Sequence, residues 1–154
     1  MSRTLWLLLI IAIVLLVIQL FRPHFENPPE NPQLAIQAVV PVPPNVQTIL
    51  DRSCYDCHSS RTRYPWYSKI APSSWLLSSD VNEGRQELSF SVFGTYPKKK
   101  ASNKLKKLCE EVKGGDMPPW YYTPMHPGSK LSDADRQTVC AWTTAAQQQI
   151  SLAR

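Results

Sequence analysis

The sequence predicts an all-α protein made of one apolar N-terminal helix and one small helical domain. Residues 5–21 are apolar almost without interruption. Apolar residues recur at helical spacing in several later segments, and no pair of segments shows the alternation of apolar and polar residues that strands show. The chain has 154 residues, which leaves about 110 residues for a single domain with a modest core.

The apolar segment 5–21 is at the short end of the range of about 17 to 25 residues that spans a bilayer. A removed signal peptide would carry small residues at an Ala-x-Ala-like site after the apolar run, but here the chain continues Gln-Leu-Phe-Arg-Pro. We therefore expect an uncleaved transmembrane anchor at 5–21 and a cytoplasmic N-terminus at 1–4. Arg3 and Arg22 flank the anchor on opposite sides, so positive charge alone does not set its orientation.

Residues 22–44 are rich in proline. Such a composition favours extended, semi-rigid geometry, so we interpret this segment as a linker that holds the domain away from the membrane. Its apolar part, residues 34–40, allows an alternative in which it packs on the domain or on a partner subunit. The domain itself is expected at 45–154.

The first helix of the domain is expected to begin at Asn45, a good N-cap, and to bury Val46, Ile49 and Leu50. A second helix should begin at Ser73 or Ser74 and end near residue 84. A third is opened by Ser102 and stopped by the glycine pair at 114–115, and a last helix follows the capping-box pattern at 132–135. The expected core residues of the later segments are Leu88, Phe90, Phe93, Leu105, Leu108, Cys109, Val112, Val139, Trp142, Ala146 and Ile150.

The pattern Cys54-Tyr55-Asp56-Cys57-His58 is typical of covalent haem attachment. Residues three and four apart share one face of a helical turn, so both thiols and the imidazole can meet one macrocycle. His58 would be the proximal iron ligand of a single haem c. The alternatives are a redox dithiol, which should accompany a βαβ pattern, and a zinc site, which needs a second closely spaced pair of ligands.

The second axial ligand of the iron is expected in the segment 116–127. Met117 is the first choice, because the two prolines that follow it stiffen the loop that would hold its thioether against iron. His126 and Met125 are the alternatives, and an open sixth position is a fourth option.

Two groups of side chains are candidates for further contacts. Contacts with haem propionates or with the haem edge are expected from Arg61, Arg63, Tyr64, Trp66, Trp120 and Tyr121, although these residues also suit an ordinary surface loop. A run of lysines lies between residues 98 and 107 and forms either a solvated face or a docking site for an acidic redox partner. The net charge of +5 accompanies no nucleic-acid motif, so nucleic acid is not an expected partner.

Cys109 and Cys140 are left over as an even pair. In an oxidising compartment they would form a disulfide, and the alternative is two small buried apolar residues.

Together these motifs resemble the small bacterial c-type cytochromes of the haem-binding domain family, which typically have an N-terminal anchor and one haem motif. The resemblance covers residues 46–142. It depends on the motif at 54–58 and on four further segments, which are Tyr64-Pro65-Trp66-Tyr67, Glu83-Gly84-Arg85, Leu88-Ser89-Phe90-Ser91, and Met117-Pro118-Pro119-Trp120-Tyr121 with His126-Pro127. Ser89 departs from the asparagine common there, and the resemblance implies haem binding and electron transfer.

We therefore expect a membrane-anchored monohaem cytochrome that carries electrons and is not itself an enzyme. Covalent haem attachment takes place outside the bacterial cytoplasm, so the domain should lie on the periplasmic side of the inner membrane. Its partners would be redox proteins, including a respiratory or photosynthetic complex of which it could be a subunit. The alternatives are an open-site haem enzyme or sensor, such as a peroxidase or gas binder, and a mainly structural haem subunit of a membrane complex.

Overall fold

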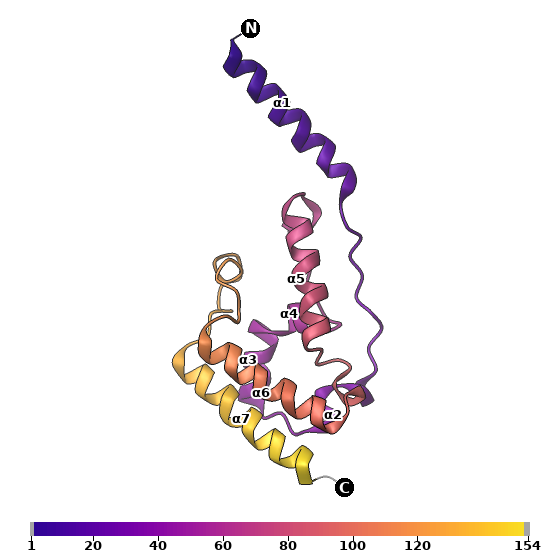
Figure 1. The fold of residues 1–154 in the computed structure, drawn as a ribbon, viewed down its shortest axis with the longest axis vertical. Helices are drawn as coiled ribbons and strands as arrows, with labels where there is room; N and C mark the ends of the chain where they lie inside the picture. The colour runs from indigo at the N-terminus through magenta and orange to yellow at the C-terminus, as the bar shows by residue number, and fades with distance from the viewer. Residues whose placement is uncertain (1, 153–154) are drawn as a thin grey trace.

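The computed structural model of the protein describes residues 2–152, and these residues form seven α-helices and no strand. The helix α1 (Arg3–Val17) projects from the domain and continues into the 3-10 turn η1 (Ile18–Phe21) (Figure 1). No side chain of α1 is buried, and Arg3–Phe21 is long and apolar enough to cross a membrane. The all-α prediction with an apolar N-terminal helix is confirmed.

The proline-rich segment packs along the domain. The side-chain amide of Asn27 donates to the carbonyl of Thr62 (2.9 Å) and accepts from its N–H (3.2 Å). The turn η2 (Pro32–Leu34) and the short helix α2 (Ile36–Val39) follow, and Ile36 and Val40 are fully buried in the core. Burial of such apolar side chains stabilises the fold, whereas an extended spacer would leave them exposed to water. The range 22–44 is therefore a linker only in part.

The helix α3 (Pro44–Ser53) buries Val46, Ile49 and Leu50 as predicted. It begins at Pro44, one residue before the expected cap Asn45. Proline is favoured at the first helical position because its missing N–H would have no helical partner there. The helix leads directly into the one-turn helix α4 (Tyr55–His58).

A turn with η3 (Trp66–Lys69) precedes the long helix α5 (Ser73–Glu87). The expected serine cap is wrong, because Pro72 is the N-cap and no side chain caps the helix. The single hydroxyl proton of Ser73 instead faces the carbonyls of Tyr67 (2.9 Å) and Ile70 (2.7 Å). The helix also runs three residues past Gly84, so this glycine lies within α5. The segment that follows includes η4 (Phe93–Thr95) and buries the expected residues Leu88, Phe90 and Phe93.

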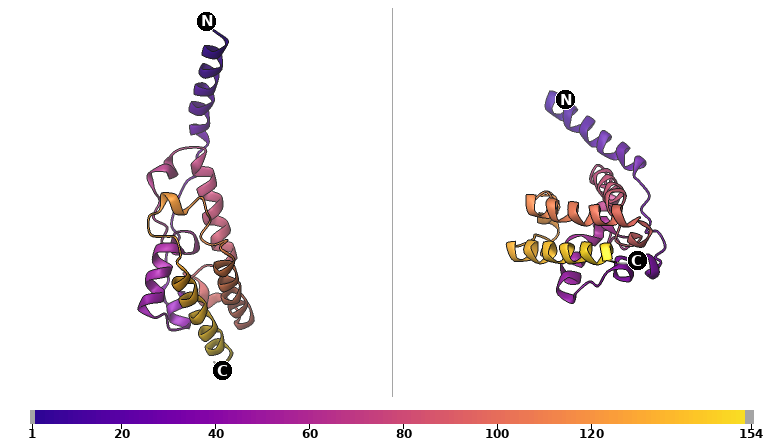
Figure 2. Two further views of the ribbon diagram at one scale, coloured as in Figure 1. Left: turned by 90° about the vertical axis from the view of Figure 1, so that its left-hand side faces the viewer. Right: turned by 60° about the horizontal axis from the view of Figure 1, so that its bottom comes forward.

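The last two long helices, α6 (Lys98–Gly114) and α7 (Asp133–Leu152), lie side by side and antiparallel (Figures 1 and 2). The helix α6 begins directly after Pro97, four residues before the expected start at Ser102. It ends at the predicted glycine pair, with Gly114 as its last residue and Gly115 as the C-cap, whose φ of +85° favours glycine. The loop between the two helices contains η5 (Thr123–Met125).

The predicted capping box at the start of α7 is confirmed. The N–H of Ser132 donates to Oδ2 of Asp135 (2.9 Å), and the N–H of Asp135 donates to Oγ of Ser132 (3.1 Å). Arg52 of α3 forms an ion pair with Asp135 at 2.7 Å. Burial opposes ionisation of this carboxyl, but the hydrogen bonds from Arg52 and Ser132 outweigh it and lower the pKa of Asp135 to about 2.

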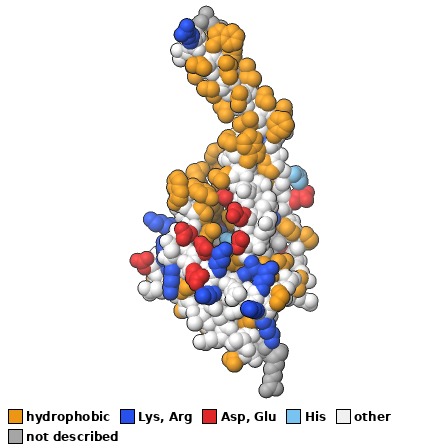
Figure 3. All heavy atoms as spheres, in the orientation of Figure 1, with side chains coloured by type: hydrophobic (Ala, Val, Ile, Leu, Met, Phe, Trp, Pro, Cys, Tyr) orange, Lys and Arg blue, Asp and Glu red, His pale blue; other side chains and the backbone are white. Residues whose placement is uncertain are grey.

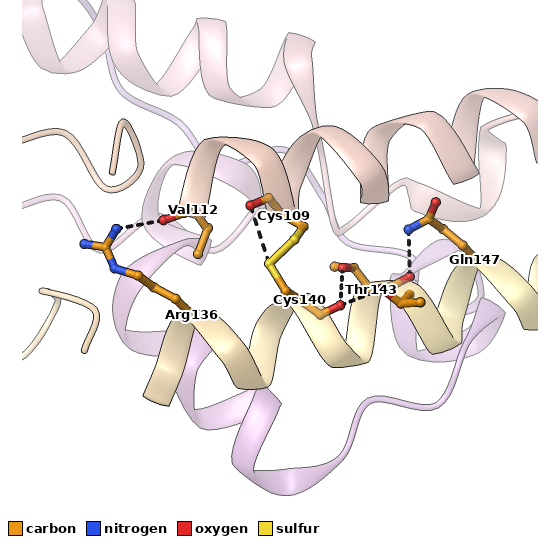
Figure 4. Close-up of a disulfide and its surroundings, with 7 residues drawn as sticks. Cys109, Val112, Arg136, Cys140, Thr143 and Gln147 are labelled. Carbon is orange, nitrogen blue, oxygen red and sulfur yellow. Dashed lines mark hydrogen bonds between the residues drawn. A yellow bond between two sulfur atoms is a disulfide. The ribbon is translucent and has the colours of Figure 1, made fainter. Parts of the chain in front are cut away.

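A disulfide joins Cys109 of α6 to Cys140 of α7, as predicted (Figure 4). Beside it, Nη1 of Arg136 donates to the carbonyl of Val112 (2.9 Å), which ties the end of α6 to the start of α7. The same pair of helices buries the predicted apolar stripe, which consists of Leu105, Leu108, Val112, Val139, Trp142, Ala146 and Ile150.

Candidate functional site

A cleft of about 760 Å³ is formed by the end of α3, α4, α5, α6 and the loop after α6. Its volume lies within the range of about 300–1,000 Å³ that is usual for cofactor and ligand sites. Among the residues that line it are Cys54, Cys57, His58 and Met117. The cleft thus brings together residues that lie about 60 positions apart in the sequence.

The turn of α4 presents the two thiols and the imidazole to the cleft. The N–H groups of Cys57 and His58 both donate to the carbonyl of Cys54, at 3.2 and 2.9 Å. The thiols of Cys54 and Cys57 are free, and burial raises the pKa of each to about 12. The dithiol alternative is expected beside a βαβ unit, and residues 2–152 contain no strand.

The His58 ring is held by two backbone carbonyls of the α5 end. Its Nδ1 lies 2.8 Å from the carbonyl oxygen of Gly84 and 2.9 Å from that of Leu88. Because carbonyls only accept hydrogen bonds, Nδ1 carries the proton, and Nε2 is left unprotonated to coordinate a metal. Burial lowers the pKa of His58, which favours this neutral form.

Gly84 is a point of close approach between α5 and the motif. A Cβ atom at this position would lie 2.9 Å from the carbonyl oxygen of Cys57 and 3.1 Å from its Cβ. The absence of a side chain therefore allows α5 to approach closely enough for its carbonyls to reach His58. The spacing of apolar residues gave no indication of this role, although Gly84 lies in one of the segments that carried the family resemblance.

The loop that carries Met117 is tied to the motif through Asp56. Asp56 is buried and accepts hydrogen bonds from Nη2 of Arg63 (2.9 Å) and from the hydroxyl of Tyr122 (3.0 Å). Burial and the charge of Asp56 both raise the pKa of Tyr122, so its hydroxyl remains a donor. Met117 is partly buried and packs against the core.

The other two candidates for the second axial ligand are placed differently. His126 stacks on Tyr122 with ring centroids 3.7 Å apart. Its Nδ1 lies 2.9 Å from the carbonyl of Tyr122, and its Nε2 lies 3.1 Å from the hydroxyl of Tyr67. Met125 is 53% exposed. Neither His126 nor Met125 is among the residues that line the cleft.

The model of the haem-binding domain family matches residues 13–145. The chain belongs to the haem-binding domain family. No curated protein and no solved structure matches the chain. Family membership supports haem as the ligand of this protein.

The cleft of this haem-binding domain fits that ligand. Two thiols and an imidazole with a free Nε2 face the same space, and the hydroxyl of Ser53 is buried at the cleft without a hydrogen-bond partner among residues 2–152. Over the same residues, no three His, Cys, Asp or Glu side chains come together as a metal site. The zinc alternative therefore has no ligand set in this part of the chain.

Of the side chains predicted to contact haem, Tyr121 lines the cleft and five others do not. Arg61 lies over the Tyr55 ring and pairs with Glu30 at 3.2 Å, and Arg63 pairs with Asp56. The two arginines thus have protein carboxylates as partners. The other three lie away from the lining, with Tyr64 against the ring of Phe25 and with Trp66 and Trp120 exposed to solvent.

Lysines of α6 line the cleft of this haem-binding domain instead. They are Lys99, Lys100, Lys104 and Lys107, which we name the lysine wall, and Glu111 of the same helix also lines the cleft. The lining residues on α5 include the acidic Asp80, Glu83 and Glu87. The ammonium group of Lys104 donates to the carbonyl of Glu87, and Lys107 pairs with the Glu87 carboxylate at 3.0 Å. Figure 3 shows basic and acidic side chains gathered on this face of the domain. The sequence contained the lysine run, but only the helix register shows which lysines face the cleft.

Proposed function

We propose that this protein is a membrane-anchored monohaem c-type cytochrome that carries electrons on the periplasmic side of the bacterial inner membrane. The observation that carries the proposal is that Cys54, Cys57, His58 and Met117 line the same cleft. The first three can attach and ligate one haem, and the fourth is a thioether of the kind that completes the iron coordination of electron carriers.

Attachment requires only the two thiols and the two vinyl groups of the porphyrin. Each thiol would add across one vinyl double bond, with the sulfur bonding to the inner carbon and the thiol hydrogen going to the outer carbon. No oxidant or reductant is consumed in this addition. Both thiols of this chain are free and adjacent to the imidazole, which is the arrangement that the addition needs.

The bound iron supplies the redox chemistry, since it can accept and release one electron. The chain contributes the orientation of His58, whose Nδ1 proton is held by the carbonyls of Gly84 and Leu88. With Met117 as the second ligand, the iron would have no position for a substrate, and methionine ligation raises the reduction potential. Both consequences support a carrier over an enzyme or a gas sensor.

The propionates of the haem would be held by the lysine wall of the cleft. The pKa of Lys104 is lowered by burial and by the neighbouring charge of Lys100, so an anion placed here would relieve repulsion between like charges. The acidic residues of α5 on the other wall make that side unfavourable for propionates.

Two features support the proposed location. The helix Arg3–Phe21 is long enough and apolar enough to span a membrane, and the disulfide of Cys109 with Cys140 is of the kind that persists in oxidising compartments such as the periplasm. Redox proteins, or a membrane complex that contains this chain, would be the partners.

Absorption spectra and redox titrations of the full-length protein test the proposal, with Met117→Ala beside His126→Ala as a matched control from the same loop. We expect Met117→Ala to lose the methionine–iron charge-transfer band, to lower the potential and to bind carbon monoxide readily. His126→Ala should keep the band. Carbon monoxide binding by the reduced wild type would favour an open-site enzyme or sensor, and a slow, incomplete redox cycle would favour a structural haem.

A further inference from the structure

Exposed apolar side chains gather at the end of the domain that faces α1. Two segments contribute them, the turn that enters α5 and the loop after α6, and both reach this end of the domain (Figure 1). Figure 3 shows apolar side chains over this end, below α1. We name these residues the aromatic end, and they are Trp66, Ile70, Trp75, Leu76, Trp120, Tyr121 and Met125.

The aromatic end is tied directly to the last residues of the N-terminal helix. The side chain of Gln19 donates to the carbonyl of Ala71 (3.0 Å) and accepts from its N–H (2.9 Å). The indole N–H of Trp75 donates to the carbonyl of Phe21 (2.8 Å), and Arg22 donates to the carbonyl of Lys69 (2.5 Å). No free spacer therefore separates the helix from this part of the domain.

The length of the helical segment sets the depth of these contacts. The 15 residues of α1 rise about 22 Å at 1.5 Å per residue, and the four residues of η1 add about 8 Å. The total of about 30 Å equals the thickness of a bilayer hydrocarbon core. If this segment spans the bilayer, its whole length is needed to cross the hydrocarbon core. Phe21 and the domain residues that are hydrogen-bonded to Phe21 and its neighbours then lie at the membrane surface.

We propose that the aromatic end is seated in the headgroup region of the membrane that α1 spans. This inference rests on the proposed membrane anchoring. Tryptophan and tyrosine favour that region because their rings combine an apolar body with a polar N–H or O–H group. Arg22 and Lys69 lie at the same level and are suited to lipid phosphates.

Tyr121 belongs both to the aromatic end and to the lining of the haem cleft. This side of the cleft is therefore close to the membrane surface. A redox partner that approaches from this side would itself be a membrane protein or a molecule at the lipid interface. The lysine wall of α6 would remain open to the aqueous phase.

Photo-crosslinking tests the proposal with the full-length haem-loaded protein. It is reconstituted in phosphatidylcholine–phosphatidylglycerol vesicles that contain a lipid with a diazirine near the headgroup, and the labelled residues are mapped by mass spectrometry. We expect labels near the two ends of segment 3–21, where it meets the headgroups, and in residues 66–76 and 120–125. Leu152 is the internal control, because it is apolar and 79% exposed but is the last residue of α7, and α7 runs to the end of the domain away from α1 (Figure 1). It should stay unlabelled.

Labels confined to residues 3–21 would overturn the docking of the aromatic end and leave the anchor intact. Labels absent from residues 3–21 as well would overturn both the docking and the proposed anchoring. In a double variant, Trp66→Ser with Trp120→Ser, we expect several-fold less labelling of Ile70 and Tyr121 and unchanged labelling of α1. Unchanged labelling of Ile70 and Tyr121 in that variant would show that the two tryptophans do not seat the domain. The control Leu152→Ser should match the wild type.

Discussion

Replacing Gly84 with alanine should destabilise the protein, although alanine is the better helix former. The new Cβ would lie 2.9 Å from the carbonyl oxygen of Cys57, which is about 0.5 Å closer than ordinary contact. The atom it meets is backbone, so α5 must move away from α4. Overpacking of this kind costs about 1–3 kcal/mol, while the change from glycine to alanine in a helix returns about 1 kcal/mol. We expect a net loss of about 1 kcal/mol, and at most about 2 kcal/mol.

The same movement would lengthen the hydrogen bonds that hold His58. The carbonyl of Gly84, which lies 2.8 Å from Nδ1 of His58, moves with α5. Weaker support at Nδ1 makes the imidazole a poorer electron donor to iron, so we expect a shifted absorption spectrum and a raised reduction potential in addition to the lost stability. Denaturation midpoints, spectra and redox titrations of the haem-loaded protein measure the three effects.

Gly114→Ala is the matched control. It is the last residue of α6, and its added Cβ would meet the flexible carboxylate of Asp116 and no backbone atom within 4 Å. This variant should keep the wild-type stability, spectrum and potential. The reasoning fails if Gly84→Ala is as stable as the wild type and its spectrum does not change.

Three further predictions concern the disulfide, the start of α7 and the lysine wall. Replacing Cys109 and Cys140 with alanine opens a loop of 31 residues and should cost about 3–4 kcal/mol in chemical denaturation; an equal midpoint for variant and wild type would contradict it. The pKa of Asp135 is lowered from 3.8 to about 2, so its contribution of about 1 kcal/mol is complete above about pH 4 and disappears as the pH falls to about 2. Asp135→Asn should flatten the stability curve in this window, and an unchanged curve would refute the assignment. Lys100→Gln removes a positive charge from the cleft and should lower the reduction potential by about 40 mV, which corresponds to about 1 kcal/mol for one charge near a partly buried site. Lys106→Gln is the control, because Lys106 is exposed and paired with Glu110, and it should leave the potential unchanged.

The helical content and most of the core could be predicted from the sequence because the apolar periodicity of long helices is a strong signal. Residues such as Val46, Leu105 and Trp142 were identified on this basis, and all are buried. Helix starts were predicted less well. Pro44 is the first residue of α3 and Pro97 directly precedes α6, and neither helix has a side-chain cap. The fixed φ of proline already suits the start of a helix, so these helices begin at proline and not at the expected Asn45 or Ser102.

The cysteine and histidine motif of the candidate site could be predicted from the sequence, but the groups that surround the motif could not. The spacing of Cys54, Cys57 and His58 requires only local chain geometry, and for that reason it could be recognised in the sequence. The carbonyls of Gly84 and Leu88 that hold His58 are backbone groups, which every residue has. The partners of Arg63 and of the cleft lysines depend on tertiary packing, so their roles needed the structure.

The helix α5 connects the proposed membrane contact to His58, the proposed haem ligand. Near its N-terminal end, the indole N–H of Trp75 donates to the carbonyl of Phe21, the last residue of η1. Near its C-terminal end, the carbonyl of Gly84 lies 2.8 Å from Nδ1 of His58. Gly84 lies nine positions after Trp75, or about 14 Å along a helix axis. Because a continuous helix is stiff, it would fix the height of the haem motif above the membrane surface whatever the path of residues 22–31. A proline placed at Ser79, an exposed position within this stretch, should therefore change the lipid labelling of the aromatic end and the His58 spectrum together, whereas Ser79→Ala should change neither.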